Sequence, residues 1–388
     1  MTKSISIFVH DLSSNPIARV VPFVKAFRDL GYDVQVLGFV FGGGEGVHIP
    51  YQGEVDPVVI ETTKRPSELF TNIRRLARAA NGDIVYAFKP LVTTLAPALY
   101  SARIVKNRPL LLDVEDEEVY LDQSWDLSAA WRKLFRGWRL GTSWKYTRLL
   151  QLFRGSADAV TVVSTELKSR YGGSIIRHGP DENDFSPVQY SEKEQQIREK
   201  WGLPQGRKLA MFTGTPRPHK GFDVLTKALL RSECKDWDFV LVGPNDNEFA
   251  RQAKKELPQR AHFLGPQSYS KIPELLSVAD AVPIPQKDTP FAEAQVPAKL
   301  LDAMAMARPI VASSTGDLPN ILGEGRRGLL VPPGDERALA QGLMSIRENP
   351  EEAEERASYA REWYKRNAST RALAERIKKI VENVKADL

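Results

Sequence analysis

Cysteine and long apolar runs are both scarce in this sequence of 388 residues. The one cysteine, Cys234, cannot form an internal disulfide or supply a cysteine-based zinc site, which favours a reducing, cytoplasmic compartment. The longest stretch without a charge, 90–102, has 13 residues and two prolines, whereas a membrane-spanning helix needs about 20 apolar residues. The apolar run at 4–10 is too short for a secretory signal. We therefore expect neither an export signal nor a transmembrane helix.

Excess positive charge is scarce outside one segment. The net charge is +5, yet residues 125–154 alone contain seven lysines or arginines and one aspartate. Two tryptophans of this segment share one helical face and three arginines flank it, a pattern typical of a helix that docks on an anionic membrane. Alternatively, the aromatic face packs on a domain core and the arginines line a cleft. No recognised nucleic-acid-binding module accompanies the charge, so nucleic acid is not an expected partner. The candidate acceptor or membrane residues here are Trp131, Arg132, Arg136, Trp138 and Arg139.

Short runs rich in valine and isoleucine alternate with segments of helical period, and this alternation occurs twice along the chain. It is typical of parallel βαβ units, so we predict an α/β protein with two Rossmann-like, doubly wound domains. A polar stretch after 186 predicts domains at 1–186 and 187–365, followed by a helix at 366–388 that in one interpretation crosses back to the N-terminal domain. The expected strands are 4–10, 33–40, 57–61, 83–88, 109–114, 159–164, 174–178, 208–214, 237–243, 261–265, 280–285, 309–313 and 328–331, and the expected helices of the first domain are 16–31, 65–80 and 91–106.

The stretch 212–221, with the sequence FTGTPRPHKG, follows an expected strand and precedes a helix. Backbone N–H groups and the positive end of a helix bind phosphate in turns of this kind, and Arg217 and Lys220 would add positive charge. Its glycine spacing matches neither a Walker loop nor a GxGxxG fingerprint. A turn with solvated basic side chains is the alternative interpretation.

A second stretch, 290–304, predicts a loop that runs into a helix, with Pro297 near the helix start. Glu293 lies before this proline and Asp302 lies one turn inside the helix. A carboxylate such as Asp302 can accept hydrogen bonds from both hydroxyls of a ribose. Helix capping and surface charge are the alternative roles of the two carboxylates.

In this order and spacing, the two stretches resemble the donor domain of retaining glycosyltransferases of the GT-B fold, family-4 type, also called glycosyl transferases group 1. The resemblance implies two Rossmann-like domains that face each other across a cleft, with a nucleotide-sugar donor in the second domain and the acceptor in the first. It also implies transfer of the sugar with retention of anomeric configuration. Further collinear segments resemble the same family, namely 157–164, 176–187, 279–285, 303–313 and 328–335.

Residue by residue, the resemblance implies roles within the second domain. Arg217 and Lys220 would neutralise the charge that grows on the diphosphate leaving group, which makes them the expected catalytic residues. Asp302 would bind the ribose. Ala294 stands where the family has its first glutamate, and Glu293, one position earlier, would contact the sugar as a catalytic residue only after a shift of register. The implied donor-binding residues are Gly214, Thr215, Arg217, Lys220, Gly243, Leu264, Glu293, Ala294 and Asp302.

The first domain departs further from the family pattern. Relatives often carry a pair of glycines after the first strand, whereas this chain has His10 and a loop without glycine, and we expect His10 on the acceptor side. An acidic run at 113–118 lies near where relatives often place a histidine close to the reacting centre, and Asp116 is the catalytic candidate there. Closely spaced carboxylates repel one another, which raises a pKa or attracts a cation or a polar sugar. A solvated acidic loop is the alternative interpretation.

These observations lead to one hypothesis with two competitors. We expect a metal-independent hexosyltransferase without a cofactor, cytoplasmic or peripheral on the inner face of the membrane. Its partners would be a nucleotide-sugar donor, a lipid-linked or membrane-associated acceptor, and an anionic membrane surface contacted through 125–154. A transferase acting on a small soluble acceptor is the first competitor. The second is a non-catalytic nucleotide-sugar-binding protein, for which Ala294 and the glycine-free first loop are the evidence.

Overall fold

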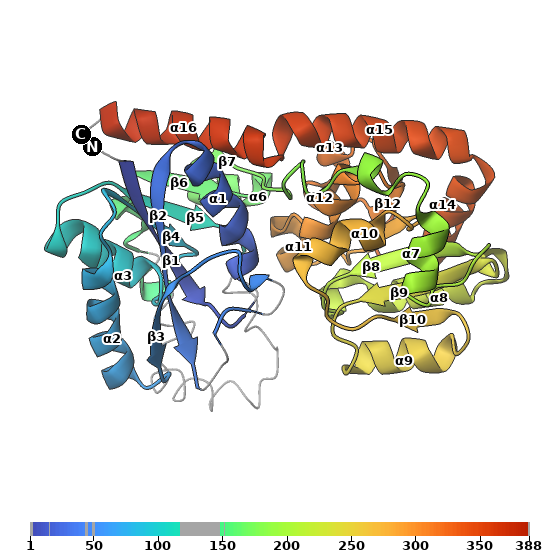
Figure 1. Ribbon diagram of the computed structural model, residues 1–388, viewed down its shortest axis with the longest axis horizontal. Coiled ribbons are helices and arrows are strands. Elements are labelled where there is room, and N and C mark those ends of the chain that lie inside the picture. The colour runs from blue at the N-terminus through green and yellow to red at the C-terminus, as the bar shows by residue number, and fades with distance from the viewer. Residues whose placement is uncertain are drawn as a thin grey trace. The chain divides into compact units, whose positions relative to one another are not determined.

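The computed structural model describes residues 3–14, 16–42, 46–48, 51–116, 148–150 and 152–386 (Figure 1). The chain divides into two compact units, which we call the first unit (Met1–Arg177 with Leu373–Leu388) and the second unit (His178–Ala372). The expected domain boundaries at 186 and 365 stay predictions. Five candidate acceptor or membrane residues lie outside the described residues, namely Trp131, Arg132, Arg136, Trp138 and Arg139.

A parallel sheet with the strand order β3-β2-β1-β4-β5-β6-β7 forms the centre of the first unit. Strands β4 (IVYAF) and β5 (LLLDV) are buried over their whole length, as central strands of a parallel sheet are. The order reverses between β1 and β4, and such a reversal leaves a crevice at the carboxyl ends of the two strands. The strands are β1 Lys3–Asp11, β2 Tyr32–Phe41, β3 Val58–Thr62, β4 Ile84–Phe88, β5 Leu110–Val114, β6 Ala159–Val162 and β7 Ser174–Ile175.

Helices and the chain ends complete the first unit. The expected helix at 91–106 begins only at Leu95 and continues as a π-helical turn over Ser101–Val105. The ammonium groups of Lys3 and Lys385 lie 5.7 and 5.8 Å from the centroid of the same ring, Tyr32, so the two ends of the chain lie side by side (Figure 1). The helices are α1 Ile17–Asp29, α2 Pro66–Ala79, α3 Leu95–Tyr100, α6 Thr165–Tyr171 and, from Leu373 onward, α16 Thr370–Ala386.

The second unit repeats the parallel α/β pattern. Its strands form the series β10-β9-β8 and β11-β12-β13, and a parallel bridge between Ala210 and Ala281 joins the two series beside β8. The strand order therefore reverses between β8 and β11. The strands are β8 Lys208–Thr213, β9 Trp237–Val242, β10 Ala261–Phe263, β11 Val282–Ile284, β12 Ile310–Ser313 and β13 Leu329–Val331. The helices are α7 Glu194–Lys200, α8 Phe222–Leu230, α9 Glu248–Glu256, α10 Ile272–Leu276, α11 Pro290–Ala294, α12 Ala298–Ala305, α13 Leu318–Ile321, α14 Glu336–Glu348 and α15 Pro350–Asn367.

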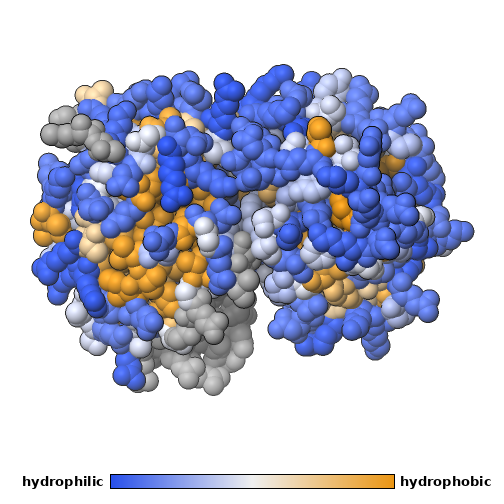
Figure 2. All heavy atoms as spheres, in the orientation of Figure 1, coloured by the Kyte–Doolittle hydropathy of each residue, from blue (hydrophilic) through white to orange (hydrophobic). Residues whose placement is uncertain are grey.

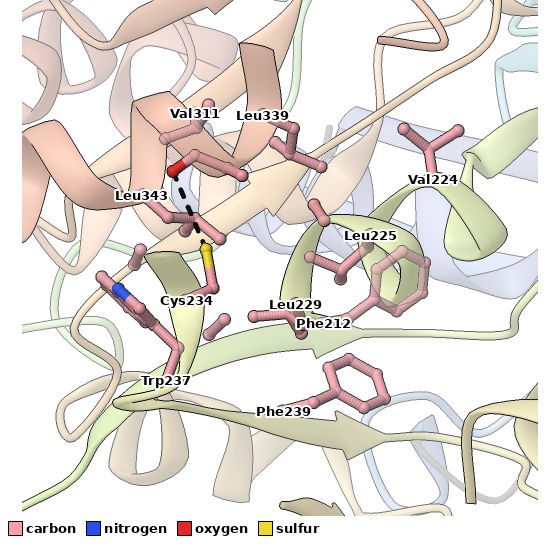
Figure 3. Close-up of a cluster of buried hydrophobic side chains, with 14 of the residues drawn as sticks. Phe212, Val224, Leu225, Leu229, Cys234, Trp237, Phe239, Val311, Leu339 and Leu343 are labelled. Atoms are coloured by element: carbon pink, nitrogen blue, oxygen red, sulfur yellow. Dashed lines mark hydrogen bonds between the residues drawn. The ribbon is translucent and has the colours of Figure 1, made fainter. Parts of the chain in front are cut away.

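An apolar cluster around Cys234 holds α8 and α14 against β8 and β9 (Figure 3). The thiol is fully buried and donates to the carbonyl of Ala340 at 3.8 Å. Burial raises the pKa of Cys234 to about 11, so the thiol stays protonated at neutral pH. Edge-to-face contacts join the ring of Phe222 to those of Phe212 and Phe239, at 5.4 and 5.2 Å. This packing fixes the end of β8 and the start of α8, between which the predicted phosphate turn lies.

Several helices begin at short polar side chains that cap the first turn. Asn247 accepts from the N–H of Ala250 at 3.0 Å at the start of α9, and Asp335 accepts from Ala338 at 2.9 Å at the start of α14. Each side chain satisfies a backbone donor that has no partner within the helix. These caps explain why both helices begin where they do.

Apolar residues gather on the visible face of the first unit, whereas hydrophilic residues cover most of the visible face of the second unit (Figure 2). The exposed apolar side chains of the first unit include Val58 and Val59 of the edge strand β3. Within the described ranges, no helix has the length and the apolar character required to cross a bilayer.

Candidate functional site

The turns that follow β8 and β9 touch each other through glycines. Gly214 and Gly243 have φ angles of +101° and +155°, and a Cβ on Gly243 would lie 2.4 Å from the carbonyl oxygen of Gly214. The N–H of Gly214 donates to Val242 at 2.8 Å, and the N–H of Gly243 donates to Gly265 at 2.9 Å. Two predicted donor-binding residues are thus neighbours at the carboxyl edge of the sheet, where parallel α/β sheets bind ligands.

A third glycine fixes the predicted phosphate turn against β11. Gly221 has a φ of +64°, and a Cβ there would lie 1.6 Å from the carbonyl oxygen of Pro285, so only glycine fits. The backbone N–H of Lys287 donates to His219 at 2.9 Å and strengthens this contact. Lys220 therefore lies at the point where the strand order reverses, while the side chain of Arg217 is exposed.

Asp302 is buried close to this turn and already has one partner. It is 5% exposed, and its Oδ1 accepts a hydrogen bond from the Tyr269 hydroxyl at 2.8 Å. Burial raises the pKa of Asp302 to about 7, against the opposing effects of the Tyr269 hydrogen bond and of Lys299. The ring of Tyr269 packs on Phe185 with 5.2 Å between centroids. No sequence motif marks Tyr269 or Lys299, which lie 33 residues before Asp302 and one helical turn before it, respectively.

Glu293 and Ala294 take opposite environments on α11. The side chain of Glu293 is exposed, whereas Ala294 is fully buried. The N–H of Glu293 donates to Thr289 at 2.9 Å, and a Cβ on Gly316 would lie 2.6 Å from the carbonyl oxygen of Glu293. These contacts fix the register of α11, so the predicted sugar contact of Glu293 would require this segment to move.

The segment after β10 is held by two hydrogen bonds of the Leu264 backbone. The N–H of Leu264 donates to Leu241 at 3.0 Å, and its carbonyl accepts from the Gln267 side chain at 2.6 Å. Thr215 is half-buried in the turn after β8. The structure therefore brings Gly214, Thr215, Gly243 and Leu264 to one edge of one sheet.

A second polar cluster lies in the first unit, again where the strand order reverses. The register of β1 against β2 shifts between Val9 and Asp11, so His10 occupies a β-bulge, a feature that re-aims a side chain. The His10 Nδ1 and the Thr93 Oγ1 are 2.5 Å apart. Lys89, just after β4, has a φ of +75°, which is strained for a residue with a side chain and is typical of functional sites.

Charged groups surround Lys89. Its Nζ lies 2.8 Å from Asp116 and 3.7 Å from Glu115. Burial raises the pKa of Glu115 to about 7, with Lys89 opposing and Asp116 adding to the rise. Burial likewise lowers the pKa of His10 to about 4, so the imidazole is neutral at neutral pH. Lys89 acts on both His10 and Glu115, and a carboxyl group that titrates near pH 7 is typical of sites that transfer protons.

Asp113, the first residue of the acidic run, has a structural partner instead. Arg19 of α1 donates from Nε and Nη2 to its two carboxylate oxygens at 2.6 and 2.8 Å, and both side chains are almost fully buried. The Thr161 hydroxyl donates to the same carboxylate at 2.5 Å. The run thus divides by position: Asp113 holds α1 to β5, and Asp116 lies beside Lys89. Its last two members, Glu117 and Glu118, lie outside the described residues.

Residues 193–363 match the family described as glycosyl transferases group 1. Over these residues the chain is similar to members of that family. The match contains every predicted donor-binding residue, from Gly214 to Asp302, so the family resemblance inferred from the motifs is confirmed.

Among curated relatives of this group 1 domain, D-inositol 3-phosphate glycosyltransferase from Corynebacterium glutamicum is 30% identical over 189 residues, which are 46% of this chain and 44% of the relative. The chain matches between 39% and 58% of the length of the first curated relatives.

Solved structures extend the likeness beyond the group 1 domain to the whole chain. Sucrose-phosphate synthase from Thermosynechococcus elongatus has a TM-score of 0.73 at 17% identity, with all of both chains covered. HepE from Anabaena, solved in complex with UDP-glucose, has a TM-score of 0.71 at 18% identity and covers 98% of this chain and 99% of its own. At these identities the likeness shows the fold alone, and it confirms the predicted α/β GT-B class with two parallel-sheet domains.

Proposed function

We propose that the protein is a retaining glycosyltransferase that takes a sugar from a nucleotide diphosphate sugar. The observation that carries the proposal is the glycine-lined turn after β8, where the Lys220 Nζ lies 4.0 Å from the Cβ position of Gly214 at the sheet edge. Lys220 and the buried carboxyl group of Asp302 both act on Lys299. Retention of configuration is taken from the family resemblance. The HepE structure binds UDP-glucose, and a donor of the same class is what this edge would bind.

In this proposal the second unit holds the donor. Backbone N–H groups of the turn at 214–221 and the side chains of Arg217 and Lys220 stabilise the diphosphate, whose negative charge grows as the glycosidic bond breaks. One oxygen of Asp302 accepts from Tyr269, so the other oxygen is the one that accepts from the ribose. These cations supply the charge compensation, so we propose that transfer proceeds without a metal ion.

The polar cluster of the first unit would orient the acceptor. The neutral His10 imidazole can accept a hydrogen bond from an acceptor hydroxyl, and Asp116 holds Lys89 in place by their 2.8 Å ion pair. Glu115 titrates near neutral pH and is the group best able to exchange a proton there. Asp116 stays the proposed catalytic candidate of the acidic run, and it would act through its ion pair with Lys89.

Nucleotide binding and turnover test the proposal together. The wild-type protein is screened by thermal shift with UDP-, GDP- and ADP-sugars, and donor hydrolysis is followed in the same samples, with Lys220→Ala as the binding-deficient variant. Stabilisation by one nucleotide class, lost in the variant and accompanied by slow hydrolysis, is the expected result. The absence of any shift would contradict the donor site. An unchanged hydrolysis rate after chelation of divalent cations is expected.

A non-catalytic nucleotide-sugar-binding protein is the second candidate. The exposed Glu293 and the buried Ala294 favour it, because neither presents a carboxylate to the sugar in the described conformation. Stabilisation by a nucleotide sugar without hydrolysis or transfer to any acceptor would support this candidate over the transferase.

The acceptor is proposed to be lipid-linked or membrane-associated, with a cytoplasmic protein docked on the inner membrane face through 125–154. Sedimentation with anionic vesicles tests this, and Trp131→Ala/Trp138→Ala is expected to remain in the supernatant while the wild-type protein sediments. Wild-type protein that stays in the supernatant would favour a small soluble acceptor.

A further inference from the structure

Lys299, the second residue of α12, is a buried cation without an ionic partner. Its residue exposure is 8%, and its Nζ lies 3.0 Å from the centroid of the Phe212 ring. In the part of the chain that the structure describes, its ammonium group makes no salt bridge and no hydrogen bond. The face of an aromatic ring offsets part of the cost of burying a charge, but a carboxylate or a phosphate offsets far more.

The surroundings of Lys299 carry more positive than negative charge. Lys220 acts on it from the turn before α8, and Asp302 acts on it from one turn further along α12. Asp302 offers only partial compensation, because its own pKa is raised to about 7 and its Oδ1 is already bonded to Tyr269. Lys299 therefore has one like charge, Lys220, and one carboxyl group near it, and that carboxyl group is only partly ionised at neutral pH. An anionic ligand would complete this charge balance.

The position of Lys299 indicates which anion. The ammonium group contacts the ring of Phe212. Phe212 is the penultimate residue of β8 and lies two positions before Gly214. The ammonium is thereby held beside the turn that carries Lys220, at the carboxyl edge of the sheet. Helix α12 holds it on the side from which Asp302 would reach the ribose. A diphosphate that joins the ribose to the sugar would pass between these groups.

We propose that Lys299 is a third cation of the donor site and binds, together with Arg217 and Lys220, the diphosphate of the nucleotide sugar. This inference rests on the proposed function and adds to it a residue that makes direct contact with the donor. The same chemistry, an anionic oxygen, also occurs in the carboxylate of a uronic acid sugar, and the experiment separates these two sources.

Proton linkage supplies a signature of this contact. Burial and the nearby Lys220 lower the pKa of Lys299 well below its ordinary value, with Asp302 opposing. A bound diphosphate favours the charged ammonium, so binding takes up a proton and affinity falls as pH rises above the lowered pKa. Titration calorimetry in two buffers with different ionisation enthalpies measures this uptake directly.

The test compares Lys299→Met with Lys299→Arg and with Lys227→Met, a matched control because Lys227 is exposed on α8. Calorimetry measures the affinity for the nucleoside, the nucleoside diphosphate and the corresponding glucose and glucuronate donors. We expect Lys299→Met to weaken diphosphate binding at least about tenfold, to leave nucleoside binding within about twofold and to abolish the additional proton uptake that the diphosphate shows over the nucleoside. Lys299→Arg should retain most of the affinity, and Lys227→Met should match the wild-type protein.

The melting temperature of the free protein separates a ligand contact from a structural role. Replacing an uncompensated buried cation by methionine removes a desolvation cost, so the free Lys299→Met protein should melt at the wild-type temperature or above it. A lower melting temperature with equal loss of affinity for every ligand would assign Lys299 a structural role and overturn the proposal.

Three further outcomes would overturn the inference in different ways. Wild-type diphosphate affinity in Lys299→Met, with affinity lost in Lys220→Ala, rejects Lys299 and leaves the proposed function standing. Selective loss of the glucuronate donor, with the diphosphate unaffected, assigns Lys299 to a sugar carboxylate instead. If the wild-type protein binds no nucleotide at all, the proposed function fails and the inference fails with it.

Discussion

At the scale of single residues, Gly221 is required by two independent features of its surroundings. Its φ of +64° is costly for other residues, and a Cβ would meet the carbonyl oxygen of Pro285. Gly202 has nearly the same φ, +63°, and nothing within 4 Å of its Cβ position. The pair separates the cost of the dihedral angle from the cost of the contact.

We expect Gly202→Ala to lower the free energy of unfolding by about 1 kcal/mol, the ordinary cost of this conformation. Gly221→Ala should lower it by about 3 kcal/mol or more, because backbone must also move. Urea unfolding of both variants measures the difference. Equal losses would mean that the turn after β8 yields easily and does not fix Lys220.

Asp302 makes the stability of the second unit depend on pH. Its pKa is about 7 in the folded protein and near the ordinary aspartate value when unfolded, so the folded state binds the proton more tightly. Stability from this group is therefore fully present below pH 4 and is lost as pH rises toward 7. Asp302→Asn should lack this loss, and the difference in unfolding free energy between variant and wild type should grow by a few kcal/mol from pH 4.5 to pH 7.5. Urea unfolding at both pH values measures it, and a constant difference would contradict the raised pKa.

At the scale of helices and strands, one buried ion pair ties α1 to the sheet of the first unit. Removing Arg19 leaves the buried Asp113 carboxylate without its cation, so Arg19→Met should cost about 3–5 kcal/mol of unfolding free energy. Arg19→Met/Asp113→Asn should recover a substantial part of this loss, because the buried charge is gone and an amide can still bond to Thr161. Chemical denaturation checks both variants, and a double variant as unstable as the single one would show that the charge is not the cause.

Sequence patterns predicted the strands and helices better than they predicted the side-chain contacts between distant segments. The apolar run at 237–243 corresponds to β9 Trp237–Val242, because a fully buried parallel strand has a continuous apolar sequence. The helix expected at 91–106 starts four residues late, because the Thr94 hydroxyl bonds to the carbonyls of Lys89 and Leu91 and holds a turn there. Lys299 could not be predicted as a ligand-facing cation, since its environment is created by β8, about 87 residues earlier in the chain.

At the scale of the whole molecule, each unit carries a polar cluster where its strand order reverses. Donor nucleotide should therefore slow hydrogen exchange of backbone amides in the second unit, at 214–221 and at Gly243, because these groups would contact the diphosphate or support that turn. Peptides from β4 in the first unit serve as the internal control. Mass spectrometry of the exchanged protein measures both, and Lys220→Ala should abolish the protection. Equal protection of β4 would indicate a global effect instead of a local site.

The last helix gives the first unit a late step in its folding. Leu373, Ile377, Val381 and Val384 of α16 are buried, and the segment that carries them belongs to the same unit as β1, whereas His178–Ala372 forms a unit that is continuous along the chain. During synthesis the intervening unit can complete its core as soon as it emerges from the ribosome. The first unit is synthesised earlier but lacks α16 until the end of the chain is made. During that interval its apolar residues are the part of the nascent chain most exposed to chaperones and to aggregation.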